Sequence, residues 1–416
     1  MAAPSTPRSL RTHIGIFGRT NAGKSSLINA LCGQAAAIVS DQEGTTTDPV
    51  YKSIELFPLG PCVLIDTAGL DDHSELGQLR RQKTLEVLAR CDIAIYVADA
   101  ARGLDAAEQA FYADLHRRGL PALLVWHKVD QPAALPAPPE AIAVSSLKQN
   151  GIRLLLQRLG SLRPESVEPG LLDGLVQPGD TVLLITPIDQ SAPKGRLILP
   201  QQRVLRDLLD LGAPALCVQP AAIPLALQAC KTTPALAITD SQAFAQVDRL
   251  LPQAVPLTSF SMLMARCKGD LPQLVAGIRQ AAYGLKDGDR VLVAEACTHH
   301  RQADDIGRVK IPRWLQEKRC LNLRFDFTAG NGFPQDLTPY ALVVHCGACM
   351  INRGEMQARL RQAQQQGVAV VNYGILIAWA TGVLTRALRP LGLESAWLPD
   401  ESCSREAEQP QAEDAR

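Results

Sequence analysis

The chain has 416 residues, more than one ordinary hydrophobic core accommodates, which predicts two or three domains. Hydrophobic residues make up 46% and charged residues 20%, a composition typical of a soluble globular protein. Lys plus Arg and Asp plus Glu both count 42, so the formal net charge is zero and provides no attraction to nucleic acid or anionic lipid. No apolar run of roughly 18 residues occurs, and Met1–Arg11 lacks the apolar core of a signal peptide. We therefore expect a cytoplasmic protein with no nucleic-acid or membrane partner.

Apolar runs alternate with amphipathic stretches along most of the chain, a pattern that predicts parallel α/β sheets. The first series extends from His13 to about Gly160, and the stretch Leu162–Gly179, rich in Pro, Gly and acidic residues, is typical of a linker. A long helix, Met262–Leu285, is predicted to join two further sets of strands. The strand candidates of these sets are Thr181–Thr186, Ala215–Gln219 and Ala235–Thr239, then Arg290–Ala296, Leu321–Phe327, Ala341–His345 and Val368–Asn372. The expected fold class is α/β, with three α/β units at residues 12–165, 175–260 and 261–398.

A phosphate-binding loop is predicted directly behind the first strand, residues 13–17. The segment consists of Gly18, Arg19, Thr20, Asn21, Ala22, Gly23, Lys24, Ser25 and Ser26, and it opens an amphipathic helix. This is the P-loop pattern in its strand–loop–helix context, in which backbone N–H groups and the helix N-terminus hold phosphates. We expect Lys24 to contact the β- and γ-phosphates and Ser25 to ligate Mg²⁺. The alternative is an ordinary Gly-rich turn.

Further motifs follow in the order that a GTPase requires. Asp66 and Gly69 come after an apolar strand and are expected to hold the Mg²⁺ hydration shell and to sense the γ-phosphate. An earlier polar loop contains Thr45 and Thr46, of which one supplies a hydroxyl to Mg²⁺. The base-binding residues are His127, Lys128, Asp130, Ser145 and Ser146. The Asp130 carboxylate can accept two hydrogen bonds from a guanine edge, so we predict binding of GTP and GDP and hydrolysis of GTP.

These motifs resemble those of the tRNA-modification and Era-type GTPases. Leu70 stands where Ras-like GTPases carry a glutamine that orients the attacking water, so hydrolysis must be organised in another way. In the resembling subfamily, an asparagine at the position of Asn21 helps to hold a K⁺ ion, which implies K⁺-stimulated hydrolysis; the alternative is that Asn21 is a turn residue. The resemblance makes Lys24, Asn21, Asp66 and Gly69 the residues expected to act in hydrolysis. His127 departs from the family, in which Asn or Thr opens the guanine motif.

Cysteine and histidine residues cluster behind two later strands. Cys297 and His299 follow one strand candidate, and His345, Cys346 and Cys349 follow another. Loops at the carboxyl ends of strands in an open α/β sheet lie at the edge where ligands bind, so the two groups are expected to converge. Zn²⁺ would take a closed set of Cys and His ligands, whereas an iron–sulfur cluster would take the three cysteines. The residues alone leave both metals open, along with scattered buried cysteines.

The spacing Cys-x-His, 45 residues, His-Cys-x-x-Cys behind a GTPase resembles the FeFe-hydrogenase maturation GTPases. The segments Ala192–Pro200 and Asp304–Pro312 match that family as well. The resemblance implies a P-loop GTPase domain at 12–165, a dimerisation domain at 175–260 and an iron–sulfur cluster-binding domain at 261–398. It also implies a 4Fe-4S cluster on Cys297, Cys346 and Cys349, with the fourth iron open to exchange or weakly held by His299 or His345.

The same resemblance implies a function and a set of partners. The family acts as a homodimeric scaffold that receives a transient di-iron precursor from two radical-SAM maturases and delivers it to apo FeFe-hydrogenase. The main alternative is an RNA-associated GTPase of the tRNA-modification or ribosome-assembly type with a structural metal site, against which the zero net charge argues. A structural zinc site behind a GTPase is a second alternative, which stoichiometric iron and sulfide after anaerobic purification would exclude.

Overall fold

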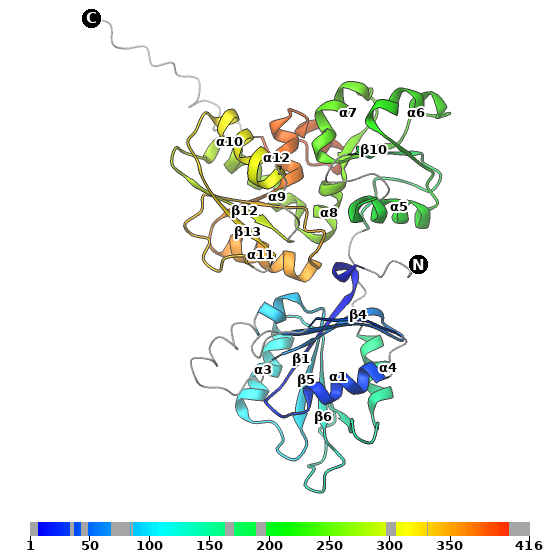
Figure 1. Cartoon of the computed structure of the whole chain (residues 1–416), viewed down its shortest axis with the longest axis vertical. Coiled ribbons are helices and arrows are strands. Elements are labelled where there is room, and N and C mark those ends of the chain that lie inside the picture. The colour runs from blue at the N-terminus through cyan, green and yellow to red at the C-terminus, as the bar shows by residue number, and fades with distance from the viewer. Residues whose placement is uncertain are drawn as a thin grey trace, which may run out of the picture. The chain divides into compact units, whose positions relative to one another are not determined.

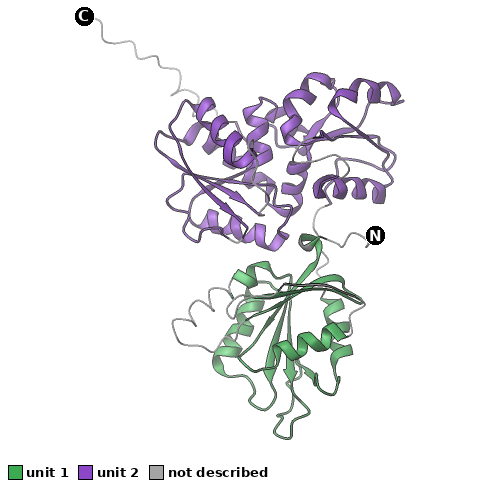
Figure 2. Ribbon diagram, viewed as in Figure 1, with its two compact units in different colours: residues 1–167 green, residues 168–416 purple. Residues whose placement is uncertain are grey.

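The computed structural model describes residues 7–33, 37–42, 49–67, 84, 86–162, 170–188, 197–296, 305–330 and 332–398. Within these ranges the chain forms three α/β sheets, which confirms the fold class expected from the sequence (Figure 1). The sheets belong to two compact units, one sheet to residues 1–167 and two to residues 168–416 (Figure 2). Among the described helices, none combines the length and the apolar character needed to cross a membrane.

The first unit contains a seven-stranded sheet in the order β2-β3-β4-β1-β5-β6-β7. Its strands are β1 (Thr12–Phe17), β2 (Ala37–Gln42), β3 (Val50–Leu56), β4 (Gly60–Asp66), β5 (Ile93–Asp99), β6 (Ala122–His127) and β7 (Ile142–Val144). The pairs β2–β3 and β3–β4 are antiparallel, and the remaining pairs are parallel. The described helices are η1 (Arg8–Leu10), α1 (Lys24–Gly33), α3 (Ala106–Arg117) and α4 (Ile152–Ser161).

Helices cover both faces of this sheet, so its central strands are apolar at nearly every position. In β5, Ile95 and Val97 join one core cluster, while Tyr96 and Ala98 join another. Since successive side chains of a strand point to opposite faces, the two clusters lie on the two faces of the sheet. The parallel strands β1, β4, β5 and β6 end at one edge, where the predicted nucleotide motifs begin.

The second unit contains two parallel four-stranded sheets, ordered β11-β10-β8-β9 and β13-β12-β14-β15. The strands of the first are β8 (Val182–Ile185), β9 (Ala215–Val218), β10 (Leu236–Thr239) and β11 (Leu257–Ser259). Those of the second are β12 (Arg290–Glu295), β13 (Arg324–Ala329), β14 (Leu342–His345) and β15 (Ala369–Asn372). The helices of the unit are α5 (Leu199–Leu211), η2 (Pro220–Ala222), α6 (Ile223–Ala229), η3 (Ser241–Ala243), α7 (Phe244–Leu250), α8 (Phe260–Lys268), α9 (Leu271–Arg279), η4 (Gln280–Gly284), η5 (Ile306–Lys310), α10 (Ile311–Arg319), α11 (Arg353–Gln365), α12 (Tyr373–Ala380), α13 (Leu384–Leu388) and η6 (Arg389–Leu391).

The long helix predicted over Met262–Leu285 is two helices, so that prediction is wrong. α8 ends at Lys268, and Gly269 leaves the helical conformation. Asp270 then caps α9, because its carboxylate accepts a 3.0 Å hydrogen bond from the backbone N–H of Gln273. Apolar periodicity runs through both helices, but a glycine followed by an N-capping aspartate ends one helix and begins the next.

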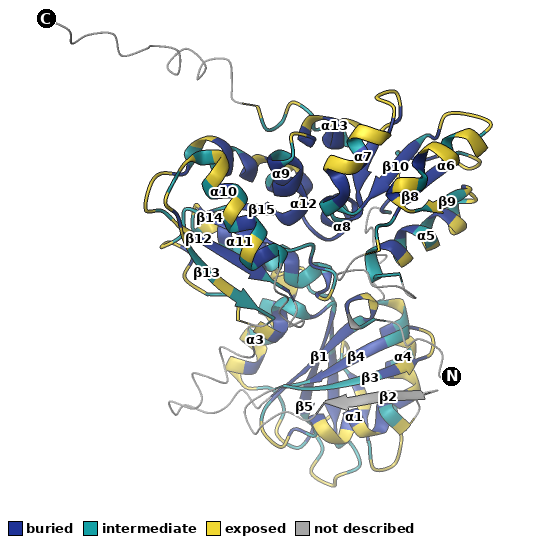
Figure 3. Ribbon diagram, turned by 45° about the horizontal axis from the view of Figure 1, so that its top comes forward, coloured by how far each residue is buried: buried dark blue, intermediate teal, exposed yellow. Residues whose placement is uncertain are grey.

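One hydrophobic core serves both sheets of the second unit. Leu183 and Ala237 of the first sheet belong to the same buried cluster as Val293 and Val343 of the second. Buried positions follow the strands and the inner sides of the helices, and exposed positions follow the outer sides (Figure 3). The shared core explains why two sheets form one compact unit.

Candidate functional sites

The predicted phosphate-binding loop lies between β1 and α1. Gly18 has a φ of +143°, and a Cβ there would lie 2.3 Å from the carbonyl oxygen of Val97, so the loop requires glycine at this point. Lys24 is the first residue of α1, and its buried ammonium donates to the backbone oxygens of Gly18 at 3.0 Å and Arg19 at 2.7 Å. The lysine head group thus lies over the loop, where the P-loop pattern requires a cation for the phosphates.

Ser25 and Asp66 come together at the edge where β4 ends. The Ser25 hydroxyl donates to Asp66 Oδ2 at 2.8 Å, and burial raises the pKa of Asp66. Among the described residues, Asp66 Oδ1 is buried without a hydrogen-bond partner. A buried carboxylate oxygen with no donor, next to a hydroxyl, is the oxygen-rich environment that Mg²⁺ prefers. The residues present therefore fit the predicted Mg²⁺ site.

The base motif contacts the P-loop through its first two residues. His127 Nδ1 lies 3.1 Å from the carbonyl oxygen of Ala22, and His127 Nε2 lies 2.7 Å from the hydroxyl of Ser146. Lys128 Nζ donates to the carbonyl oxygen of Asn21 at 2.6 Å and to Asp99 at 2.6 Å. The structure thus brings together the P-loop and the two predicted base-binding segments.

Asp130 and Ser145 complete the base motif; Asp130 is partly exposed and Ser145 is buried. A side-chain hydrogen bond with Ser145 lowers the pKa of Asp130, and Ser145 also accepts the N–H of Lys148 at 3.1 Å. The carboxylate therefore stays charged at neutral pH and faces solvent, as an acceptor for the N–H groups of a guanine requires.

Some predicted residues have other roles or lie outside the described part of the chain. The Arg19 guanidinium pairs with Asp105 at 2.9 Å, at the start of α3, and the side chains of Thr20 and Ser26 are exposed. Thr45, Thr46, Gly69 and Leu70 lie outside the described residues. Sequence reasoning missed Asp99, which holds Lys128; the available signal was an acidic residue ending an apolar strand.

Cys346 and Cys349 lie on the loop that follows β14. The Cys346 sulfur accepts a 3.1 Å hydrogen bond from the backbone N–H of Ala296, which follows β12, and burial raises the pKa of Cys346 to about 11. Lys268 holds this loop, because the lysine ammonium donates to three carbonyl oxygens of the loop. Cys297 and His299 lie outside the described residues, and within the described ranges no three Cys, His, Asp or Glu side chains are grouped to hold a metal.

His345 is buried, and both of its ring nitrogens have partners in the protein. Arg359 can only donate, so at 3.1 Å it donates to Nε2, and Nδ1 then carries the proton directed at the carbonyl oxygen of Cys346 at 2.9 Å. Burial and the nearby guanidinium lower the pKa of His345 to about 3. In this geometry the ring orients the cysteine loop through both of its nitrogens, and His345 as a metal ligand stays a prediction.

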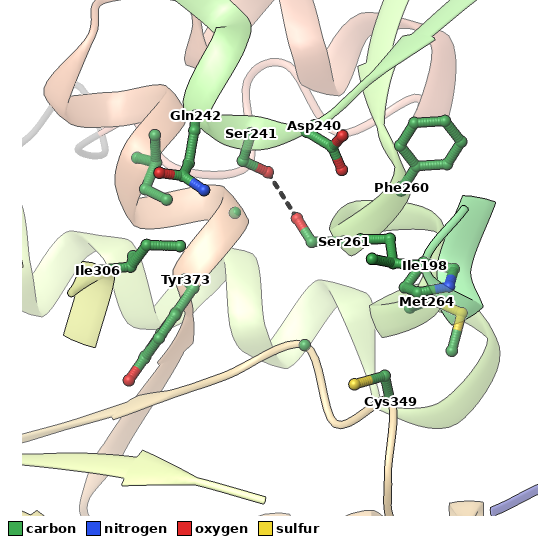
Figure 4. A pocket seen from close by; sticks show the side chains of 14 residues that line it. Ile198, Asp240, Ser241, Gln242, Phe260, Ser261, Met264, Ile306, Cys349 and Tyr373 are labelled. Carbon is green, nitrogen blue, oxygen red and sulfur yellow. Dashed lines mark hydrogen bonds between the residues drawn. The ribbon is translucent and has the colours of Figure 1, made fainter. Parts of the chain in front are cut away.

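A cavity of about 180 Å³ opens beside Cys349 (Figure 4). Segments at the carboxyl ends of strands from both sheets line it: Asp240, Ser241, Gln242, Phe260, Ser261, Gly347, Cys349, Tyr373 and Gly374, with Ile198, Pro200, Met264, Ile306 and Ile377. The hydroxyls of Ser241 and Ser261 lie 2.7 Å apart and point toward one another, while Cys349 lies on another wall. Carboxyl ends of parallel strands are where α/β folds bind ligands.

Three family models match the chain. A 50S ribosome-binding GTPase matches residues 13–128, a hydrogen maturase F dimerization domain matches residues 171–269, and a hydrogen maturase F tetramerization domain matches residues 272–390. The third model covers the region that the sequence predicted to bind a cluster, and its description is one of self-association.

Curated relatives match the first unit. The chain is 35% identical over 156 residues to the tRNA modification GTPase MnmE of Ralstonia nicotianae. This alignment covers 34% of this chain and 33% of that protein. It is 31% identical over 171 residues to the GTPase Der of Trichlorobacter lovleyi, in an alignment that covers 39% of this chain and 38% of that protein. The chain therefore spans only 33% to 38% of the length of these relatives. Aquifex aeolicus Era is 19% identical and covers 57% of this chain and 97% of its own, with a TM-score of 0.31, too low to carry an argument.

The two matches behind the GTPase domain identify the chain. The relatives of the first unit are GTPases, and the contacts of Lys24, Ser25 and Asp66 are those expected of a nucleotide site. The second unit carries both self-association domains of one protein type, in order, from residue 171 to residue 390. With its P-loop GTPase domain in front of them, the chain belongs to the hydrogen maturase F family.

Proposed function

We propose that this protein is a GTP-hydrolysing scaffold that holds a 4Fe-4S cluster on Cys297, Cys346 and Cys349 and delivers a di-iron precursor to apo FeFe-hydrogenase. The observation that carries the proposal is the hydrogen bond from the Ala296 N–H to the Cys346 sulfur. Ala296 directly precedes Cys297 in the chain, and consecutive Cα atoms are about 3.8 Å apart. The bond thus joins the end of the β12 segment to the loop that carries Cys346 and Cys349.

The described residues fit such a cluster. Iron–sulfur clusters are bound by cysteine thiolates, and backbone N–H groups directed at the sulfurs tune them, as the Ala296 N–H does for Cys346. When bound by three cysteines, the cluster would supply one iron without a cysteine ligand, where a precursor can attach. We assign His345 to orienting the loop, and His299 remains the proposed imidazole ligand.

The cavity beside Cys349 is the proposed place for the cargo. At about 180 Å³ it has room for a compact ligand, since a water molecule occupies roughly 30 Å³ in the liquid. The Ser241 and Ser261 hydroxyls offer polar contacts to a ligand, beside Asp240 and Gln242. Two radical-SAM maturases are the proposed source of the di-iron precursor, and a homodimer is the proposed acting form.

The GTPase unit is proposed to bind Mg²⁺ through Ser25 and Thr46, with Asp66 holding its hydration shell. The unpartnered Oδ1 of Asp66 supports this assignment. K⁺ is proposed to assist hydrolysis beside Asn21. Asn21 also has a φ of +63°, a conformation that asparagine tolerates better than most residues, so a turn role is the competing explanation.

Co-expression with the two maturases and apo FeFe-hydrogenase, scored by hydrogen evolution, tests the function. We expect Cys346→Ala and Cys349→Ala to abolish maturation, whereas Cys320→Ala, at an exposed position outside the loop, should retain it. Anaerobically purified protein is expected to contain iron and sulfide in proportion. Protein that contains zinc instead, with maturation retained in both loop variants, would refute the proposal.

A further inference from the structure

The ring of His127 occupies the space between the P-loop and the loop that closes the base pocket. The residue ends β6, and only 3% of its surface is exposed. A Cβ on Gly23 would lie 2.1 Å from His127 Nδ1, so the ring packs directly on the P-loop backbone. The contacts with Ala22 and Ser146 complete a bridge between two loops that are distant in sequence.

The partners of the ring define which nitrogen carries the proton when the ring is neutral. The Ala22 carbonyl oxygen can only accept, so Nδ1 carries a proton and donates to it. Nε2 of a neutral ring then offers a lone pair, which accepts the Ser146 hydroxyl at 2.7 Å. A positively charged ring would direct an N–H at the Ser146 oxygen, so the hydroxyl proton would turn away and the hydrogen bond would reverse its direction.

The bridge also orients the phosphate loop. The Ala22 carbonyl and the Gly23 N–H belong to one planar trans peptide unit and point in opposite directions. Holding the carbonyl on His127 therefore directs the Gly23 N–H away from the ring, as an N–H that binds phosphate must be directed. Lys128 holds the preceding carbonyl, that of Asn21, at 2.6 Å.

We infer that His127 is a positioning residue that joins the phosphate loop to the base-binding loop through a neutral ring buried between them, so that nucleotide affinity falls at mildly acidic pH. The charged groups acting on the ring are Lys128 on its own loop, Asp99 at the end of β5, and Asp130, while Lys24 of α1 is directed at P-loop carbonyls. The two aspartates favour a proton and Lys128 opposes it.

Burial outweighs the aspartates, and the pKa of His127 lies below its ordinary value of about 6.5. At pH values above about 6.5 the ring is neutral both in the assembled bridge and in a solvated, open loop, so pH does not change how readily the bridge forms. Below this pH the open loop takes up a proton that the assembled bridge resists, and assembly becomes less favourable.

GDP and GTP affinities of the full chain, measured between pH 5.5 and 7.5, test the inference. Wild-type affinity is expected to fall several-fold toward pH 5.5. His127→Asn should abolish that fall and bind within about threefold of wild type at pH 7.5, since an amide can donate to Ala22 and accept from Ser146. His127→Phe should bind about tenfold or more weakly, because it leaves both partners without a hydrogen bond.

His116→Asn is the control, since His116 is an exposed histidine on α3 and its loss should leave the wild-type pH profile unchanged. Equal pH profiles for wild type and His127→Asn would overturn the inference. So would a folded His127→Phe variant, verified by circular dichroism, that binds GDP as tightly as wild type. If His127→Phe fails to fold, the comparison of wild type with His127→Asn alone decides.

Discussion

Replacing Lys268 by methionine removes the group that supports the cysteine loop. Lys268 ends α8 and is 1% exposed, and its ammonium donates to the carbonyl oxygens of Ala348 at 3.1 Å, Cys349 at 3.3 Å and Ile351 at 2.7 Å. Methionine is similar in length and apolar, so it fills the space but donates no hydrogen bond. The substitution therefore tests the hydrogen bonds rather than the packing.

The expected effect is large for a single substitution. Each buried carbonyl that loses its hydrogen-bond donor lowers the free energy of unfolding by roughly 1–3 kcal/mol. Part of this loss is offset, because the variant no longer has to bury a charged ammonium. We expect the free energy of unfolding of the second unit to fall by about 3 kcal/mol. At roughly 2–4 °C per kcal/mol for a unit of this size, its melting temperature should fall by about 10 °C.

Calorimetry of the full chain measures this change. Added GDP identifies the unfolding transition of the GTPase unit, because ligand binding raises the melting temperature of the unit that binds it. Lys286→Met, which removes an exposed ammonium from the same unit, should shift the melting temperature by no more than about 1 °C. Iron bound after anaerobic reconstitution should fall in Lys268→Met and not in Lys286→Met. A melting temperature of Lys268→Met equal to wild type would show that the ammonium does not hold the loop.

Three further predictions concern the nucleotide and cluster sites. Lys24→Ala should reduce GTP hydrolysis at least 100-fold, about 2.7 kcal/mol of transition-state stabilisation, without changing iron content, and unchanged turnover would contradict the P-loop assignment. Asn21→Gly keeps the positive φ but removes the amide, so hydrolysis should become equally fast in K⁺ and Na⁺; a retained K⁺ preference would leave Asn21 as a turn residue only. Cys346→Ala and Cys349→Ala should each lose most of the bound iron but keep wild-type GTP hydrolysis, whereas the control Cys320→Ala should keep its iron. Equal iron content in all three variants would exclude the loop as a cluster site.

The nucleotide site was largely predictable because its chemistry is carried by contiguous segments. A strand, a Gly-rich loop and a helix in direct succession define a P-loop, and the Lys24 ammonium lies on the backbone of this loop. Ser25 and Asp66 are 41 residues apart, but Asp66 ends β4 and Ser25 comes behind the adjacent parallel strand β1, so their contact also follows from the α/β pattern. The break between α8 and α9 was encoded as well, in Gly269 and Asp270, but the apolar periodicity obscured it.

The sequence by itself determined the fold class, the GTPase motifs and the family of this protein, because strand periodicity and motif spacing are local properties of the chain. Only the tertiary structure decided which partners the buried rings of His127 and His345 have. His345 has Arg359 on one nitrogen and a loop carbonyl on the other, and His127 has Ala22, 105 residues away, and Ser146. Whether an imidazole nitrogen is free for a metal, or bound to a neighbour, depends on which donors and acceptors the fold brings against the ring, and no spacing along the chain encodes that.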